Sequence, residues 1–402
     1  MADVARTVWQ FAMAAGWVFG RGAVDQTGQY LAKRSVRCAL IVSDANIERL
    51  GLVARVTTSL ANHGIRATVF PGCVAEPPFV LAEQAAAVGG SQTDIVIGLG
   101  GGSNIDVAKV AAVLLAHGGS PRDYFGFDRV PGPILPLVAI PTTAGTGSEV
   151  SHSAVLTDRE NGTKVSTLSQ WLRPTLAIVD PSLSDTCPPT VTAHSGIDAL
   201  VHAIEAVTAR PFRQMANLDP QSRAYEGAYS FTELLASDAI SRIGRSLVRA
   251  YHDQHDSDAR DDMALAATLA GMAFSNSGVA IVHALEYPLG VLTHCSHGEG
   301  NGLLLPHVMR YNLDAARPQF EKIARWLSAD SITTHCTAES AVDRVVQLQQ
   351  AIGIRARLRD LGLLREQIPQ VASIAFQIKR LMDTNPRPPS LSDLENILEA
   401  AW

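Results

Sequence analysis

The sequence predicts two domains: an α/β domain built on a parallel sheet over residues 1–190, and an all-helical domain over residues 191–402. Up to about Asp180, short β-branched runs alternate with helical stretches, which is the pattern of βαβ units. A proline-rich passage follows near residues 185–195, and helical periodicity dominates from there to the end. A chain of 402 residues is long enough for two domains of ordinary size.

The composition is that of a protein with a large core, since 47% of the residues are apolar and 18% are charged. The net charge of −6 comes without a basic run, which excludes nucleic acid and membrane surfaces as expected partners and favours a small-molecule substrate. Five widely spaced cysteines without a CxxC pair suit reduced thiols in a cytoplasmic protein. The apolar stretch 9–20 is too short to span a bilayer and has no cationic lead, so we expect no signal or anchor.

Local patterns place the elements in order along the chain. Apolar and β-branched runs predict strands at 38–42, 67–70, 94–99, 136–140 and 176–179. Helical patterns end near 60 and cover 79–90, 198–207 and 263–274. Residues 210–230 indicate a loop insertion, and residues 251–262 a solvated turn between helices.

The stretch GGGSNIDVAK at 100–109 directly follows the predicted strand 94–99. A strand, a glycine-rich turn and a helix beginning near Asn104 bring free backbone N–H groups and a helix N-terminus to one point, which is an anion site. The spacing matches neither GxGxxG nor a P-loop, because Lys109 lies too far into the helix to reach a γ-phosphate. A Rossmann-like dinucleotide domain fits better, with these candidate contacts: Gly100, Gly101, Gly102, Ser103 and Asp106.

A second loop of small residues, 141–149, again follows a strand and carries the hydroxyl groups of Thr142, Thr143 and Thr146. Two such loops at neighbouring strand ends would line one crevice at the carboxyl edge of a parallel sheet. Asp44 follows an earlier strand at the same edge, where a carboxylate can bind both ribose hydroxyls and repel a 2′-phosphate. This favours NAD over NADP. The alternative is that each loop is only a turn and Asp44 only a helix cap.

A candidate metal site begins with Asp198 and His202, which are four residues apart on a helical segment and therefore project from one face. We expect His283 near the end of an apolar helix that Pro288 breaks, and His297 among glycines that allow a sharp turn. One carboxylate and three imidazoles suit Fe²⁺, Zn²⁺ or Mn²⁺. Taken alone, the first pair is more often a capping carboxylate and a satisfied histidine.

These motifs resemble those of the iron-containing (group III) alcohol dehydrogenases over nearly the whole chain. The family's glycine signature resembles residues 100–109, and its second loop resembles residues 141–149. Its helix signature is similar to GIDALVHAIEAV at 196–207. Its C-terminal signature is similar to AFSNSGVAIVHALEYPLG at 273–290 followed by SHGEGNGLLLPHVM at 296–309.

The resemblance implies an NAD-dependent alcohol dehydrogenase, or aldehyde reductase, with its active site in a cleft between the two domains. It carries over Asp198, His202, His283 and His297 as metal ligands, with Fe²⁺ as the implied ion, and places Lys164 near the cofactor. The ion would polarise the substrate oxygen while hydride moves between a primary alcohol and the nicotinamide. A homodimer or larger homo-oligomer is implied as well.

One position departs from the family pattern. Many members carry a further histidine four residues after the ligand equivalent to His283, where this chain has Tyr287. Tyrosine is a poor proton acceptor near neutral pH. Either Tyr287 only packs, or the proton leaves through water or through His294.

Three other functions remain alternatives. EYPLG and RAYEGAYS are similar to features of hydroxyacid–oxoacid transhydrogenases, which oxidise 4-hydroxybutyrate-like acids, and the substrate carboxylate would then need a cation such as Arg210, Arg213 or Arg223. Dehydroquinate-synthase-like lyases share a glycine-rich loop and a metal, but the match at 273–309 speaks against them. A catalytically inactive binding protein has little support, because all four ligand positions are filled.

Overall fold

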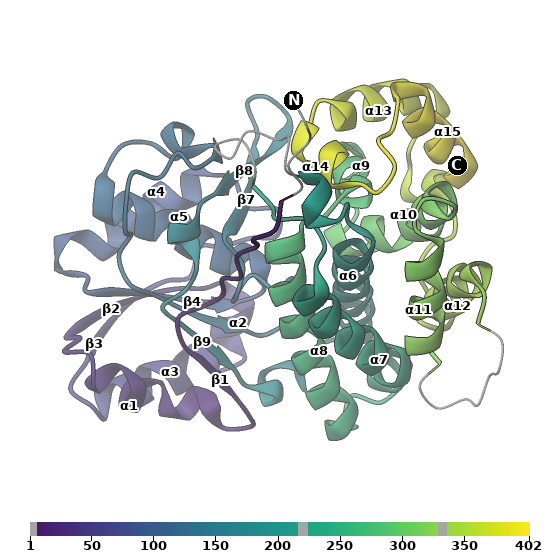
Figure 1. The fold of residues 1–402 in the computed structure, drawn as a ribbon. Coiled ribbons are helices and arrows are strands. Elements are labelled where there is room, and N and C mark those ends of the chain that lie inside the picture. The colour runs from purple at the N-terminus through teal and green to yellow at the C-terminus, as the bar shows by residue number, and fades with distance from the viewer. Residues whose placement is uncertain (1–5, 216–223, 329–335) are drawn as a thin grey trace. The chain divides into compact units, whose positions relative to one another are not determined.

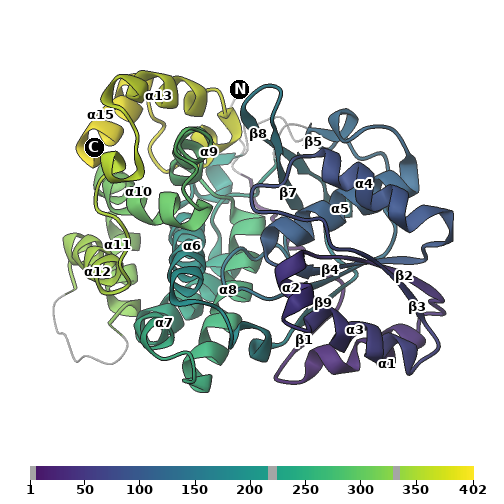
Figure 2. The ribbon, with the colours of Figure 1, turned by 180° about the vertical axis from the view of Figure 1, so that it is seen from behind.

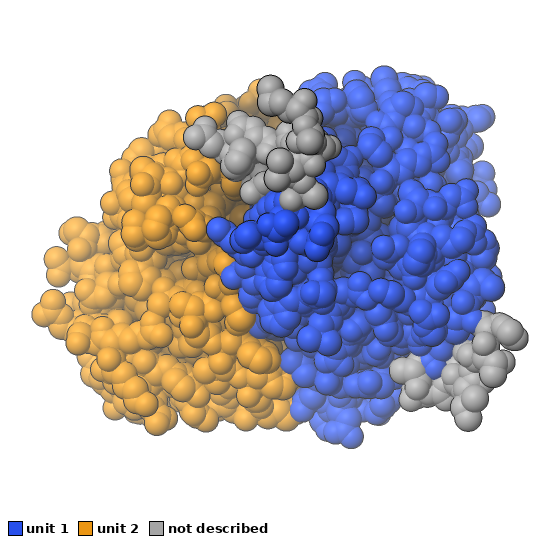
Figure 3. All heavy atoms as spheres, in the orientation of Figure 1, with its two compact units in different colours: residues 1–11, 187–402 blue, residues 12–186 orange. Residues whose placement is uncertain are grey.

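The computed structural model describes residues 6–215, 224–328 and 336–402. The chain divides into two compact units, coloured separately in Figure 3. Unit 2 is Ala12–Thr186, and unit 1 combines Cys187–Trp402 with the described residues up to Phe11. The predicted domain limits, 1–190 and 191–402, stay a prediction.

Unit 2 is built on a six-stranded parallel sheet in the order β1-β9-β6-β4-β2-β3. Its strands are β1 (Trp17–Phe19), β2 (Cys38–Val42), β3 (Arg66–Phe70), β4 (Ile95–Gly100), β6 (Leu137–Pro141) and β9 (Leu176–Val179). The predicted α/β class is therefore confirmed. The edge strand β1 was not predicted, and it lies within the apolar stretch 9–20. Every predicted strand is present within a residue or two of its predicted limits.

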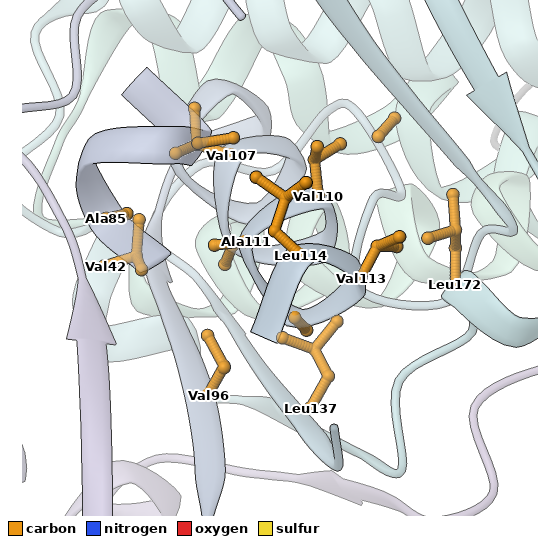
Figure 4. Close-up of a cluster of buried hydrophobic side chains, with 14 of the residues drawn as sticks. Val42, Ala85, Val96, Val107, Val110, Ala111, Val113, Leu114, Leu137 and Leu172 are labelled. Carbon is orange, nitrogen blue, oxygen red and sulfur yellow. The ribbon is translucent and has the colours of Figure 1, made fainter. Parts of the chain in front are cut away.

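Helices cover both faces of this sheet, because alternate residues of each buried strand point to opposite sides. Leu40 and Val42 face α4 and α5, in the cluster that Figure 4 shows, whereas Ala39 and Ile41 face α1 and α3. Figures 1 and 2 show α4 and α5 on one side of the sheet and α1 and α3 on the other. The helices are α1 (Thr27–Ala32), α2 (Ala45–Arg49), α3 (Leu52–Ala61), α4 (Val80–Gly89) and α5 (Gly102–His117).

A second sheet in unit 2 was not predicted. It has the order β5-β8-β7, and its strands are β5 (Gly126–Phe127), β7 (Ser153–Asp158) and β8 (Thr163–Leu168). Strands β7 and β8 form an antiparallel pair joined at the turn that contains Gly162. Their sequences are rich in threonine and serine, so the period-2 pattern lacks the apolar contrast that identifies a strand.

In the ranges that the structure describes, the regular elements of unit 1 from Pro189 onward are all helices, as predicted. The helix α6 (Pro189–Thr208) is buried over most of its length and packs against α7, α8 and α10. The helices that follow are α7 (Ser230–His252), α8 (Ser257–Ser277), α9 (Ile281–Thr293), α10 (His297–Asn312), α11 (Arg317–Trp326), α12 (Ala338–Ala351), α13 (Ile368–Phe376), α14 (Lys379–Thr384) and α15 (Leu391–Ala401). No single helix in the described ranges combines the length and hydropathy needed to cross a membrane, and only the bent pair α8 and α9 reaches that level together.

Candidate metal centre and nucleotide loops

The helix α6 presents Asp198 and His202 on one face, as their spacing predicted. His202 Nδ1 lies 3.8 Å from Asp198 Oδ2, and both side chains are buried. Phe274, on α8, stacks face to face on the imidazole of His202 with 4.1 Å between ring centroids. The aromatic ring therefore restricts the rotation of this imidazole.

The third residue, His283, lies in the first turn of α9 and not at the end of a helix. Pro288 is inside α9, which continues to Thr293, so the predicted break at this proline was wrong. The break comes earlier, at Gly278, whose φ of 106° ends α8. His283 Nε2 is 4.0 Å from Asp198 Oδ1.

Glu205 fixes both the start of α9 and the orientation of His283. One carboxylate oxygen accepts hydrogen bonds from Ala280 N, at 2.9 Å, and from His283 Nδ1, at 2.6 Å. The other accepts a hydrogen bond from Val282 N at 2.8 Å. Because the proton of His283 is held on Nδ1, the lone pair of Nε2 is directed toward Asp198.

His297 is the first residue of α10, with Nε2 3.8 Å from Asp198 Oδ1. Its Nδ1 bonds to Glu286 Oε2, which repeats the carboxylate–imidazole pairing seen at His283. Asn301 Nδ2 donates to Asp198 at 2.8 Å and also lies 3.1 Å from His297 Nε2. The His297 side chain is 34% exposed, whereas the side chains of Asp198 and His283 are 3% exposed, so His297 is the ligand candidate that solvent reaches.

The glycines that follow His297 do not form a sharp turn, which corrects the expectation from the sequence. They lie inside α10 and allow it to approach its neighbours closely. A Cβ at Gly298 would lie 1.9 Å from the backbone oxygen of His194, and one at Gly302 would lie 2.9 Å from the side chain of Ile197. The glycines therefore bring the N-terminus of α10 against α6.

The residues of this cluster fit a divalent cation. Ligand atoms of Asp198, His202 and His283 lie within 4.8 Å of one another. His283 Nε2 is buried and has no hydrogen-bond partner among the described residues, as expected for a nitrogen atom that binds a metal ion. Burial alone would raise the pKa of Asp198, but the adjacent His202, His297 and His283, with the hydrogen bond from Asn301, hold that pKa below its ordinary value. A mixed N/O donor set of this kind suits Fe²⁺, Zn²⁺ or Mn²⁺.

Tyr287 and His294 occupy different environments. Tyr287 lies one turn after His283 on α9, with its ring 6.2 Å from that of His297 between centroids. His294 caps the end of α9 in a left-handed conformation, with φ of 55°, and is exposed. The structure therefore brings Tyr287 beside the metal cluster and does not place His294 in it.

In unit 2 the structure brings the two small-residue loops together. Thr142 N donates to Gly100 O at 3.0 Å, and a Cβ built on Gly102 would lie 2.9 Å from Thr146 Oγ1. Gly101 faces Thr143, whose Oγ1 would be 3.7 Å from a Cβ at that position. Only glycine is suited to position 100, because the φ of this residue is 142° and the amide of Asn104 occupies the space where a Cβ would lie.

The helix α5 begins at Gly102, earlier than predicted, so Gly102 and Ser103 form its first turn. The N–H groups of a first turn have no acceptor within their own helix. They lie where β4 ends, next to the loop after β6. The anion site at the carboxyl edge of the sheet stays a prediction, with which this arrangement is compatible.

Asp44 caps α2 and is also tied to the glycine-rich loop. Its Oδ1 accepts hydrogen bonds from the backbone of Asn46 at 2.8 Å and Ile47 at 3.1 Å. Its Oδ2 accepts from Asn104 Nδ2 at 2.7 Å. The helix-cap alternative is therefore present, while the ribose contact stays a prediction.

Asp106 and Lys109 join α5 to the segment that follows the second loop. Asp106 accepts hydrogen bonds from Ser148 Oγ at 2.6 Å and Val155 N at 2.8 Å. The Lys109 ammonium is fully buried and donates to Ser148 Oγ, Ser151 Oγ and Ser153 O at 2.7–3.0 Å. The Lys109 ammonium is thus held by serine oxygens, in agreement with the prediction that it does not reach a γ-phosphate. The cofactor contact of Asp106 stays a prediction.

Lys109 gives the protein a pH-dependent stability. Burial lowers the pKa of Lys109 to about 8, against the charges of Asp106 and Glu149, which raise it. An unfolded lysine keeps its proton to about pH 10.4, so between these values the unfolded chain binds more protons and stability rises with pH. We therefore compare the free energy of unfolding in urea of wild type with that of Lys109→Met. The difference should shift in favour of wild type by about 2 kcal/mol between about pH 7.5 and about pH 10.

The exposed Lys33 supplies the control for this prediction. Lys33→Met should differ from wild type by the same amount at both pH values. A Lys109→Met difference that is equally independent of pH would contradict the assigned shift.

The other predicted contact residues that the structure describes have partners of their own. Lys164, on β8, pairs with Glu76 at 3.1 Å. Arg210 N donates to Thr384 O at 2.8 Å, and the exposed Arg213 stacks on Phe212. Arg223 lies outside the described residues.

The sequence did not reveal the side chains that orient the histidines. Glu205 and Glu286 are buried at 3% and 0% exposure. Each glutamate is isolated in an otherwise apolar helix, and this pattern could have indicated its role, because a buried carboxylate requires a partner. Asn301, buried at 0% in α10, gave no comparable signal.

The comparisons with known proteins agree with this geometry. Residues 15–181 match the family described as iron-containing alcohol dehydrogenase, and residues 224–402 match the Fe-containing alcohol dehydrogenase family, C-terminal. The long-chain-alcohol dehydrogenase 1 of Geobacillus thermodenitrificans is 37% identical over 100% of this chain and 97% of its own. The lactaldehyde reductase of Escherichia coli is 33% identical over 96% of this chain and 97% of its own.

A solved structure of a 1,3-propanediol oxidoreductase superposes with a TM-score of 0.91 at 33% identity, covering 98% of this chain and 100% of its own. An alcohol dehydrogenase from Oenococcus oeni gives a TM-score of 0.88 at 29% identity, covering 98% of this chain and 100% of its own. Fold, sequence motifs and the histidine–aspartate cluster thus agree, and the chain belongs to the iron-containing alcohol dehydrogenase family.

Proposed function

We propose that this oxidoreductase interconverts small primary alcohols and aldehydes with NAD(H), using Fe²⁺ held by Asp198, His202, His283 and His297. The observation that carries this proposal is the convergence of four donors from three helices, with the buried His283 Nε2 left without a partner. Zn²⁺ and Mn²⁺ suit the same donors. Relatives named as methanol dehydrogenase and 1,3-propanediol dehydrogenase support small alcohols as the substrate class.

The chain's own residues would orient the reaction. A bound divalent ion supplies Lewis-acid polarisation of the substrate oxygen, and the nicotinamide exchanges the hydride. Glu205 and Glu286 hold the Nδ1 protons of His283 and His297, so the lone pair of each Nε2 would be available to the ion. Asn301 Nδ2, 3.1 Å from His297 Nε2, would give way there. His297 is the exposed member of the set, so substrate would reach the ion from its side. Tyr287 packs beside His297 there, and water would carry the proton.

We propose that the glycine-rich loop and the threonine loop bind the pyrophosphate of NAD. The first-turn N–H groups of α5 supply donors, and the hydroxyl groups of Thr142, Thr143 and Thr146 lie on the facing loop. Asp44, joined to this loop through Asn104, would accept the ribose hydroxyls. Lys164 and Asp106 stay as predicted cofactor contacts.

The preference for NAD should depend on Asp44. We expect Asp44→Gly to lower the NAD-over-NADP ratio of kcat/KM by about tenfold, because a carboxylate that repels a 2′-phosphate is lost. Asp44→Asn is the matched variant, since asparagine keeps the cap of α2 without the charge. An unchanged ratio in both variants would remove Asp44 from the ribose site.

The proposed reaction is tested by following NADH oxidation with a panel of aldehydes and ω-oxo acids. The protein is stripped with a chelator and reloaded anaerobically with Fe²⁺ or Zn²⁺. Activity that returns only with metal, and with simple aldehydes, supports the proposal. Turnover of ω-oxo acids alone would favour 4-hydroxybutyrate-type chemistry. Turnover with an oxoacid acceptor and no free NAD would identify a transhydrogenase, and no redox activity would favour the lyase alternative.

Two further properties are proposed with this function. The chain has five free cysteines, which is compatible with a cytoplasmic protein. We also propose that it forms a homodimer or larger homo-oligomer, which sedimentation of the purified protein would test.

A further inference from the structure

A buried arginine in unit 1 forms no ion pair with the described residues. Arg260, in the first turns of α8, is 3% exposed. Its Nη1 donates to Thr192 Oγ1, on α6, at 2.7 Å. Its Nε and Nη2 are buried and have no hydrogen-bond partner among the described residues. A guanidinium buried away from water needs an acceptor for the protons on these two nitrogen atoms.

Two acidic residues near Arg260 in the sequence, Asp256 and Asp262, are engaged by other arginines. Asp256 receives both hydrogen bonds of a bidentate pair from Arg249, at 2.9 Å each. Asp262 binds Arg242 and Arg245 at 2.6–3.1 Å. Within the described ranges, no carboxylate forms an ion pair with Arg260. The positive charge is therefore not balanced by this part of the chain.

The surroundings of Arg260 add to the positive potential. Thr192 lies in the first turns of α6, and its N–H donates to Pro188 O at 3.0 Å. The N–H groups of Thr190 and Val191 precede this first hydrogen bond of the helix, and together with the helix dipole they favour an anion. One turn farther along, the helices are in close contact, since a Cβ at Gly196 would lie 2.3 Å from Leu247 and 3.0 Å from Met263. Because Arg260 is 3% exposed and the helices are in contact one turn away, a monatomic anion fits beside the guanidinium better than a phosphate does.

We propose that Arg260 and the first turn of α6 bind a chloride ion. The ion would accept hydrogen bonds from Nε and Nη2 of Arg260. It would anchor the N-terminal end of α6, the helix that carries Asp198 and His202. This site is separate from the metal cluster and does not depend on the proposed reaction.

Crystals of the full chain grown in sodium bromide test the proposal directly. We expect an anomalous bromide peak within hydrogen-bond distance of Arg260 Nε and Nη2, and none at the same place in crystals grown in sodium acetate. A water molecule or a backbone carbonyl on these nitrogen atoms in the bromide crystals would overturn the proposal.

Thermal unfolding provides a second readout. At constant ionic strength, replacing gluconate by chloride should raise the melting temperature of wild type by about 2–4 °C. Arg260→Met should melt at the same temperature in both salts. If that variant does not fold, Thr192→Val, which removes one hydrogen bond and leaves the guanidinium, should retain the chloride dependence. A wild type that is insensitive to chloride would contradict the proposal.

Discussion

His283→Ala is expected to lower turnover by about 10³-fold or more while leaving the Kd for NADH unchanged. His283 supplies a buried Nε2 within 4.0 Å of Asp198, and no other described side chain is placed to replace it. Loss of about 4 kcal/mol of transition-state stabilisation corresponds to this factor. Asp198→Ala should behave in the same way. Steady-state kinetics and NADH fluorescence titration measure the two quantities separately.

The control for this experiment is His255→Ala. His255 is exposed in the turn before α8, so its removal should leave kinetics and metal content unchanged. His283→Gln is a second variant that retains a hydrogen-bond donor for Glu205. It separates the loss of the metal ligand from a general loss of folding stability. Wild-type rates in a folded His283→Ala protein would remove His283 from the metal site.

Gly298→Ala is expected to destabilise the protein by about 3 kcal/mol or more and to reduce metal affinity. The added Cβ would lie 1.9 Å from the backbone oxygen of His194 and 3.2 Å from Asp198 Cβ. Because both are parts of α6, a side-chain rotation cannot relieve the overlap, and α10 must move away. His297 lies next to this glycine and would be displaced from Asp198. Denaturant unfolding and metal titration measure the two effects.

Gly132→Ala is the matched substitution, since its Cβ would be 3.8 Å from its nearest neighbour, His117 Cε1. It should change stability by less than about 1 kcal/mol. A Gly298→Ala protein with wild-type stability and wild-type metal affinity would contradict the close contact between α10 and α6.

The parallel sheet could be predicted because its inner strands are buried on both faces and appear as continuous apolar runs, such as 38–42 and 95–100. The antiparallel pair β7 and β8 could not, because its partly exposed residues have no comparable contrast. Strand β1 has only three residues, and its pairing with β9 depends on a segment far away in the sequence.

The pair Asp198 and His202 could be predicted from helical spacing, and the resemblance to a known family added His283 and His297. The local environment of these two histidines was misjudged, because Pro288 and the glycines after His297 usually interrupt helices. Tertiary packing outweighed this preference: α9 tolerates its proline, and α10 uses glycines to contact α6. Glu205 is 78 residues from its partner His283, so spacing could not connect them.

The most direct test of the metal assignment is the metal content of the protein after anaerobic reconstitution. Wild type and His283→Ala are loaded with Fe²⁺, separated from free metal by gel filtration and analysed by mass spectrometry of the metal. We predict about one ion per chain in wild type, and a 10–100-fold or greater loss of affinity in the variant. Equal metal retention by a folded His283→Ala protein, or none in wild type, would contradict the assignment of the Asp198–His202–His283–His297 cluster as the metal site.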